Sequence, residues 1–192
     1  MFALSSLELF IKTREGFCER AYRCPNGHLT VGYGHNLESN VISKETASVI
    51  LAEDVRKVIS RLESDKLKHI RRLPENWQFV CADMLFNIGS ASFLGMRRLN
   101  EALEKHAFDK ALAELVDSSW FTQVGDRSKL LWLIAYKDIV FGLDLARDSS
   151  DKIRKVFNKH FAEWFTKTYP NRDSDASPVP RRVKDTYTWA IG

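Results

Sequence analysis

Three residues near the N-terminus have side chains and a spacing suited to acid-assisted hydrolysis. Glu15 directly precedes Gly16, Cys24 follows after eight intervening residues, and Thr30 follows after five more. Hydrolysis of a glycosidic bond needs an acid that protonates the leaving oxygen, and a second group that directs water or attacks carbon. Because the acid has to keep its proton near neutral pH, we expect Glu15 to be partly shielded from water.

Cys24 leaves two chemical interpretations open. A free thiol titrates near ~8.5 and is only a few per cent thiolate at neutral pH, and an ionised Glu15 nearby would raise the pKa of Cys24 further. A thiol is therefore a weak general base, but a thiolate is a good nucleophile, so the inverting or retaining outcome stays open. A disulfide between Cys18 and Cys24 would mask this thiol; we favour free thiols.

The elements expected around these residues place them close together. A capping box formed by Ser5 and Glu8 predicts a first helix that begins near Ser5. The turn sequence Pro25-Asn26-Gly27 separates two short strands in residues 20–36, which we expect to form the only sheet. This hairpin would bring Cys24 and Thr30 near each other and back toward the end of the first helix.

From Ser43 onward the apolar residues recur at helical spacing. We predict a long helix over 43–63 and another that begins at Pro74, a favourable first position for proline. Gly89 to Gly95 should interrupt this second helix, and further helices are expected over 96–105, 108–118 and 127–143. The face of the Pro74 helix that we expect to be buried carries Trp77, Val80, Cys81, Met84, Leu85 and Ile88.

The C-terminal part has a different character. Residues 149–168 predict an amphipathic helix, followed by a polar, turn-rich segment up to Arg182 and a short aromatic end with Tyr187 and Trp189. We favour packing of this helix on its own domain. The alternative is a surface that contacts a membrane, a cell-wall partner or a second copy of the chain.

The chain resembles the T-even-phage-type lysozymes, glycoside hydrolase family 24. Glu15, Cys24 and Thr30 match the family motif E-x8-[D or C]-x5-T, in which many members have Asp at the central position. Each further match is weak alone, but together they run in the right order over about residues 5 to 143. These matches are Thr30 to His35, Ile42 to Glu45, Glu53 to Val55, Phe86 to Gly89, Trp120 to Gln123 and Arg127.

The resemblance implies a mainly α protein of the lysozyme-like α+β class. A small N-terminal lobe would carry the short antiparallel sheet, a larger helical C-terminal lobe would follow, and the 43–63 helix would link them across a substrate cleft. The catalytic domain would cover 1–143. Residues 144–192 would form an extension that the resemblance does not cover.

The resemblance also implies residue roles. Glu15 would be the general acid, Cys24 would position or activate water or attack the sugar, and Thr30 would help hold that water or a covalent adduct. The supporting residues would be Arg127, which fixes the Glu15 carboxyl, His35 and Asp54, which form a structural ion pair, and Gln123 and Asn87, which line the sugar cleft.

The implied activity is that of an endolysin, a muramidase that lyses bacteria by cleaving the β-1,4 bond between N-acetylmuramic acid and N-acetylglucosamine. No cofactor is expected, nor a metal, because no Cys/His cluster has metal-ligand spacing. The net charge of +4 suits an anionic polymer, but no nucleic-acid motif accompanies it, so no nucleic-acid partner is expected.

The sequence also bears on location and on competing functions. The start of the chain lacks a signal-peptide pattern, so we expect a protein that is made in a bacterial host cytoplasm and reaches periplasmic peptidoglycan after release or delivery. We also expect a monomer. One alternative is a catalytically idle lysozyme fold that binds wall glycan or a partner. Another is a lytic transglycosylase, which Cys24 and Thr30 at motif spacing argue against.

Overall fold

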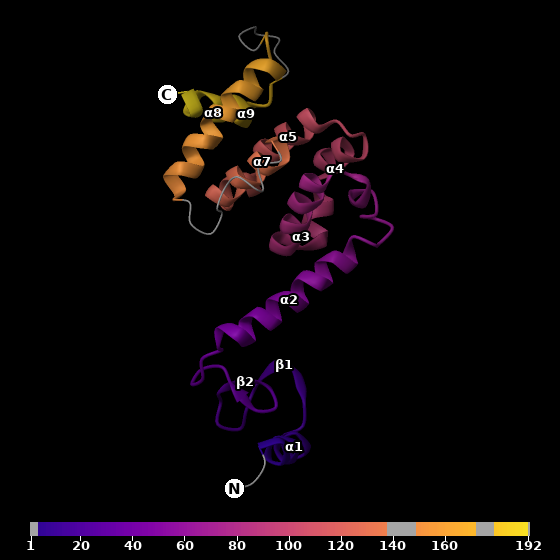
Figure 1. Ribbon diagram of the computed structural model, residues 1–192, viewed down its shortest axis with the longest axis vertical. Coiled ribbons are helices and arrows are strands. Elements are labelled where there is room, and N and C mark those ends of the chain that lie inside the picture. Colours follow the sequence, from indigo (N-terminus) through magenta and orange to yellow (C-terminus); the bar gives the residue numbers. More distant parts are fainter. Residues whose placement is uncertain (1–3, 138–148, 172–178, 192) are drawn as a thin grey trace. The chain divides into compact units, whose positions relative to one another are not determined.

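The computed structural model describes residues 4–137, 149–171 and 179–191. Within these residues the chain is mainly helical with one small antiparallel sheet, which confirms the predicted fold class (Figure 1). The chain divides into two compact units, residues 1–53 and 54–192, so the division falls inside a long helix.

The first unit contains helix α1 (Leu4–Glu15), three strands and the start of α2 (Lys44–Arg61). The strands β1 (Cys18–Arg23), β2 (Leu29–Gly32) and β3 (His35–Asn36) form an antiparallel sheet in that order. Thr30 pairs with Tyr22 on one side and with Asn36 on the other. The hairpin over 20–36 is confirmed, and the third strand adds to it.

This first unit is held mainly by backbone pairing and polar contacts. Thr30 is the one buried residue among residues 4–53, with 4% of its surface exposed, and α1 buries no side chain. The turn between β1 and β2 closes through a hydrogen bond from the Gly27 amide to the Cys24 carbonyl at 2.8 Å. Gly27 has a φ of +84°, a conformation that glycine adopts without steric cost.

The second unit is a helical bundle around one apolar core. The expected interruption in the Pro74 helix is present as a kink at Gly89, whose φ is +73°. The short helix α6 was not expected. After α2 the elements are η1 (Ile70–Arg72), α3 (Glu75–Gly95), α4 (Arg97–Glu104), α5 (Phe108–Asp117), α6 (Ser119–Gln123) and α7 (Asp126–Lys137).

The C-terminal helices share this core. The apolar face of α8 (Ser150–Thr168) is buried, and Trp132 of α7 contacts the rings of Phe157 and Phe161 with centroids 5.3 and 5.4 Å apart. The apolar face of 149–168 thus packs within its own unit. Helix α9 (Arg181–Ile191) follows, where an irregular aromatic end was expected. The proposed domain boundary at 143/144 and the end of the 127–143 helix lie outside the described residues.

An ion pair fastens α8 to the start of α7. Arg154 donates two hydrogen bonds to Asp126, at 2.9 and 3.1 Å, and Lys129 donates a third at 2.9 Å. The Asp126 side chain is 18% exposed. These contacts, above all the hydrogen bonds from Arg154, hold the pKa of Asp126 well below its usual range.

We expect Asp126→Asn to lower the free energy of unfolding by about 1–2 kcal/mol, because charge-assisted hydrogen bonds to a shielded carboxylate are lost. A carboxyl with a depressed pKa stabilises the folded state above its unfolded pKa of ~3.9, and that contribution disappears as the pH falls through the folded pKa. Denaturant titrations at pH 7 and pH 3 should therefore differ less for the variant than for the wild type.

Asp151→Asn is the matched control for this prediction. Asp151 lies 3.8 Å from the same arginine, but its side chain is 94% exposed. Exposed ion pairs contribute little to stability, so this change should stay within ~0.5 kcal/mol. Equal losses for both variants would contradict the role given to Asp126.

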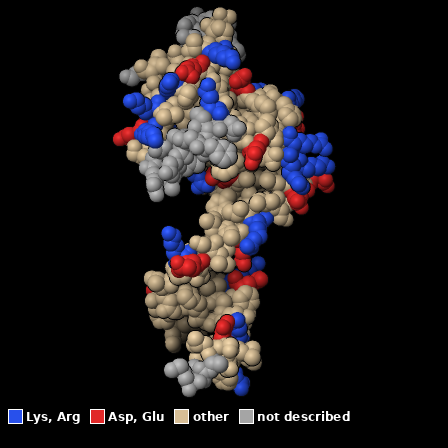
Figure 2. All heavy atoms as spheres, viewed as in Figure 1, with Lys and Arg blue, Asp and Glu red and all other residues tan. Residues whose placement is uncertain are grey.

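Basic and acidic side chains are interspersed over the face of residues 54–192 that Figure 2 shows. Within the described ranges no single helix has the length and apolar composition needed to cross a membrane. Helices α3 and α4 have this length and composition only when they are taken together, and the chain bends by 92° between them.

Candidate active site

Cys24 and Thr30 meet at the base of the hairpin. The Cys24 amide donates to the His28 carbonyl at 3.0 Å, directly after the Arg23–Leu29 pair of the β1–β2 ladder. The Thr30 hydroxyl donates to the same carbonyl at 3.1 Å and is also hydrogen-bonded to the Cys24 thiol. The spacing of these two residues therefore produces a side-chain contact.

The surroundings of Cys24 favour its thiolate. Burial raises the pKa of the Cys24 thiol, but hydrogen bonds with the Asn26 and His28 backbone and with the Thr30 side chain outweigh that effect and lower the pKa. Hydrogen bonds to the charged form have this direction in general. The sequence led us to expect a raised pKa through Glu15, and the turn amides reverse that direction.

Glu15 ends α1 and lies against the turn between β2 and β3. A Cβ atom built on Gly34 would be 3.4 Å from the Glu15 Oε2 atom, and Gly34 has a φ of +83°. The rings of Phe17 and Tyr33 meet beside this contact, with centroids 5.3 Å apart. Glu15 is thus next to the sheet that carries Thr30. It is exposed in the structure, whereas we expected partial shielding.

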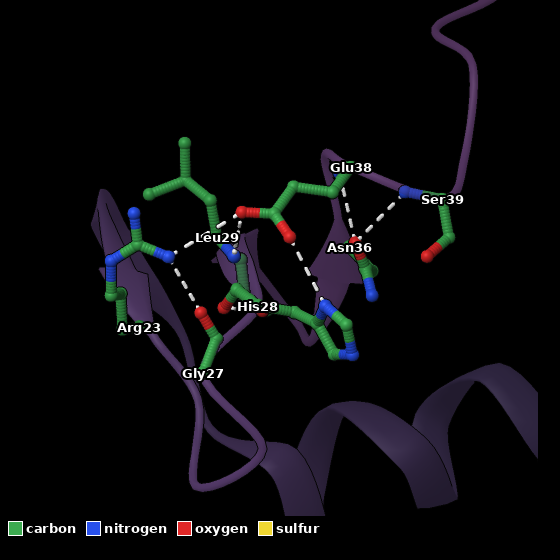
Figure 3. A network of polar contacts seen from close by, with 8 residues as sticks. Arg23, Gly27, His28, Leu29, Asn36, Glu38 and Ser39 are labelled. Carbon is green, nitrogen blue, oxygen red and sulfur yellow. Dashed lines mark hydrogen bonds and ion pairs between the residues drawn. The ribbon is translucent and has the colours of Figure 1, made fainter.

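A polar network around Glu38 fixes the mouth of the hairpin (Figure 3). Its carboxylate contacts His28 Nδ1 at 3.1 Å and accepts from the Leu29 amide at 3.1 Å and from Arg23 at 3.5 Å. The hydrogen bond with His28 is the main cause of the lowered pKa of Glu38. Asn36 accepts from the amides of Glu38 and Ser39. These contacts hold the segment that bears the Cys24–Thr30 pair.

In the second unit, Arg127 lies in the first turn of α7 and contacts α3. Its guanidinium donates to both carboxylate oxygens of Asp83, with Nε at 3.0 Å and Nη2 at 2.7 Å. This bidentate geometry is the one that arginine favours with carboxylates, and it orients the Arg127 side chain. The expected contact of Arg127 with Glu15 stays a prediction.

Asn87 lies on α3 and Gln123 ends α6, both in the second unit. Asn87 follows Asp83 by one turn of α3, and its Oδ1 accepts from Trp120 Nε1 at 2.9 Å. Trp120 and Gln123 line a pocket of about 570 Å³ formed by the end of α3 with α4, α5 and α6. The structure therefore gathers these predicted cleft residues on one side of the second unit.

The sequence model of the family described as Phage lysozyme matches residues 12–132, which include every predicted site residue. This chain belongs to the Phage lysozyme family.

Two relatives of this Phage lysozyme family member extend the comparison. An endolysin of Acyrthosiphon pisum secondary endosymbiont phage 1 is 32% identical over 129 residues, which cover 66% of this chain and 86% of the relative. A probable T4-type lysozyme 2 of Dictyostelium discoideum is 25% identical over 153 residues, covering 65% of this chain and 90% of the relative.

The remaining predicted residues of this Phage lysozyme family member have separate surroundings. His35 is exposed and pairs with Val31 in the β2–β3 ladder. Asp54 accepts from Lys57 at 3.0 Å on α2. The expected ion pair between His35 and Asp54 stays a prediction.

The three cysteines of this family member have distinct surroundings. Cys18 and Cys24 are free thiols in the structure. Cys81 is buried, as expected for α3, and burial raises the pKa of its thiol to about 12. The described ranges contain no group of three or more His, Cys, Asp or Glu that would hold a metal ion.

Two contacts of this site were missing from the sequence interpretation. Glu38 and Asp83 fix the hairpin and Arg127, yet each lies far along the chain from its partner. No local pattern marks them. Glu38 follows β3 in a polar turn, and Asp83 looks like any acidic residue on a helix.

Proposed function

We propose that this protein is an endolysin-type muramidase, which hydrolyses the β-1,4 bond between N-acetylmuramic acid and N-acetylglucosamine and thereby lyses bacterial cells. Membership of the Phage lysozyme family supports a peptidoglycan-cleaving glycoside hydrolase in the broad sense. The observation that carries the finer proposal is the Cys24 thiol, hydrogen-bonded to Thr30 and to turn amides that favour its thiolate.

In this proposal Glu15 gives its proton to the leaving glycosidic oxygen. The Cys24 thiolate either takes a proton from water that attacks the anomeric carbon, or itself attacks that carbon and forms an adduct that water then hydrolyses. Thr30 holds the water or the adduct. Because Glu15 is exposed in the free protein, bound glycan has to supply the partial desolvation that a general acid needs.

The supporting residues act on substrate and geometry. Arg127, held by Asp83, fixes the Glu15 carboxyl, while Asn87 and Gln123 contact the glycan. His35 and Asp54 support the fold. We propose that the protein is made in a host cytoplasm and reaches the periplasmic wall after release or delivery. Its proposed catalytic domain is 1–143, and it needs no cofactor.

Mass spectrometry of digested peptidoglycan tests this proposal directly. Purified sacculi are incubated with the full chain, and the soluble fragments are reduced with borohydride before analysis. A muramidase leaves N-acetylmuramic acid at the reducing ends. Reducing N-acetylglucosamine ends would instead show that the other glycosidic bond is cut, and anhydro ends would show a transglycosylase.

The second candidate is a catalytically idle binder of wall glycan. It predicts no soluble fragments at any enzyme concentration, while the protein still sediments with the sacculi. Fragments that appear with the wild type and disappear with Glu15→Gln would exclude this candidate.

A further inference from the structure

A second pocket lies where helix α9 packs near α6 and α7. Its volume is about 330 Å³, and all of its lining residues belong to the second unit. Three of its seven lining residues come from α9, which lies beyond the part of the chain that the family matches. It is lined by Phe121, Thr122, Gly125, Lys129, Asp185, Thr186 and Trp189.

Trp189 is the unusual member of this pocket. Its surface is 53% exposed, whereas the other four tryptophans of the chain are at most 5% exposed. An ammonium group supports the indole, because Lys129 Nζ lies 5.5 Å from the ring centroid and also donates to Asp126 at 2.9 Å. The ring is therefore held beside the pocket and not folded into the core.

The polar groups of the pocket are mostly acceptors. The hydroxyls of Thr122 and Thr186 donate to backbone carbonyls of their own helices, at 2.8 and 2.7 Å, so their oxygens keep lone pairs for a ligand. Asp185 adds an exposed carboxylate whose ion pair with Arg181 is long, at 3.9 Å. Lys129 is paired with Asp126 and Asp185 with Arg181, so both charges have partners of opposite sign and the pocket suits a neutral ligand with many donors.

An N-acetylated pyranose has these properties. One face of the sugar ring presents C–H groups that pack on an indole, while its hydroxyls and amide N–H donate to carboxylate and hydroxyl oxygens. We propose that this pocket binds an N-acetylglucosamine unit of a glycan strand, as a holding site separate from the catalytic residues. The choice of glycan rests on the proposed function; the geometry of the pocket does not.

Protection of Trp189 from oxidation tests this inference in the full chain. N-bromosuccinimide reacts with exposed indoles, and peptide mass spectrometry then reports oxidation at each tryptophan separately. The probe is N-acetylated chitotetraose, added to Glu15→Gln so that the probe is not hydrolysed. We expect saturating tetrasaccharide to slow oxidation of Trp189 about tenfold, because a stacked sugar covers the ring, while the four buried tryptophans stay unchanged.

Binding measured by calorimetry provides the variant test. Trp189→Ala and Asp185→Ala should each raise the dissociation constant of the tetrasaccharide about tenfold at this site, equal to ~1.4 kcal/mol. Ile191→Ala is the matched control, since Ile191 is 60% exposed on the same helix but does not line the pocket. Melting temperatures of all three variants check that α9 stays folded.

Two outcomes would overturn the inference: no protection of Trp189 by the tetrasaccharide, or an equal loss of binding in Ile191→Ala. If the sugar gives no protection but anionic lipid vesicles do, the pocket belongs to a membrane surface instead. Failure here leaves the muropeptide products unchanged, because the catalytic residues lie outside this pocket. A failure of the proposed function would appear in those products while Trp189 remained protected.

Discussion

Glu15→Gln should reduce the release of soluble muropeptides by about 10²–10⁴-fold, the contribution typical of general acid catalysis. Glutamine keeps the shape of the side chain but has no proton to give to the leaving oxygen. Because Glu15 is exposed at the end of α1 beside Gly34, the substitution should leave folding intact. The rate of turbidity loss of a peptidoglycan suspension, with circular dichroism as a check on folding, measures both effects.

Glu8→Gln is the matched control on the same helix. Glu8 forms an exposed ion pair with Lys12 at 2.6 Å, and pairs of this kind contribute only ~0.3–0.5 kcal/mol. Removing this ion pair should keep the rate at which the peptidoglycan suspension clears within about twofold of the wild-type rate. If Glu8→Gln and Glu15→Gln were equally active, Glu15 would not be the acid, and the general-acid mechanism would have to be abandoned.

The sequence predicted those parts of the fold that local patterns determine. The Pro25–Gly27 turn, the helical spacing after Ser43 and the glycine at 89 each appear where expected. Helix α9 was missed because its only buried residue is Val183 and its Thr and Tyr residues are modest helix formers. Its stability comes from packing, as in the stack of Tyr187 on Phe165 with centroids 4.1 Å apart.

At the candidate site, too, local spacing predicted some features and tertiary packing determines the others. The spacing of Cys24 and Thr30 was enough to predict their contact, because a tight turn fixes which residues of a hairpin face each other. The partners that orient the site, Glu38 and Asp83, are chosen by tertiary packing and leave no periodic signal. The direction of the pKa shift of Cys24 depended on turn amides, which sequence spacing alone did not suggest.

Cys24→Ala should lower the rate of turbidity loss by at least about a hundredfold, because alanine can neither take a proton nor attack carbon. Cys24→Asp should keep most of the activity, since Asp offers a carboxylate in the same place. The thiolate of the wild type and the carboxylate of Cys24→Asp should give different pH dependences of the rate. A reactive thiolate makes the rate rise with pH through the pKa of Cys24, which lies below the ordinary thiol value, and Cys24→Asp should move this limb toward an ordinary Asp pKa of ~3.9.

Alkylation separates Cys24 from the other thiols. Iodoacetamide reacts with thiolates, so the wild type and Cys18→Ser should lose activity at the same rate, while buried Cys81, with its pKa of about 12, stays unmodified. Protection in Cys18→Ser would assign the reactive thiol to Cys18 and contradict the proposal. An adduct of one glycan fragment on Cys24 during turnover, seen by intact mass, would identify the thiolate as nucleophile. Full activity without any adduct would favour the route through activated water, because both routes need the same thiolate and only one leaves sugar on sulfur.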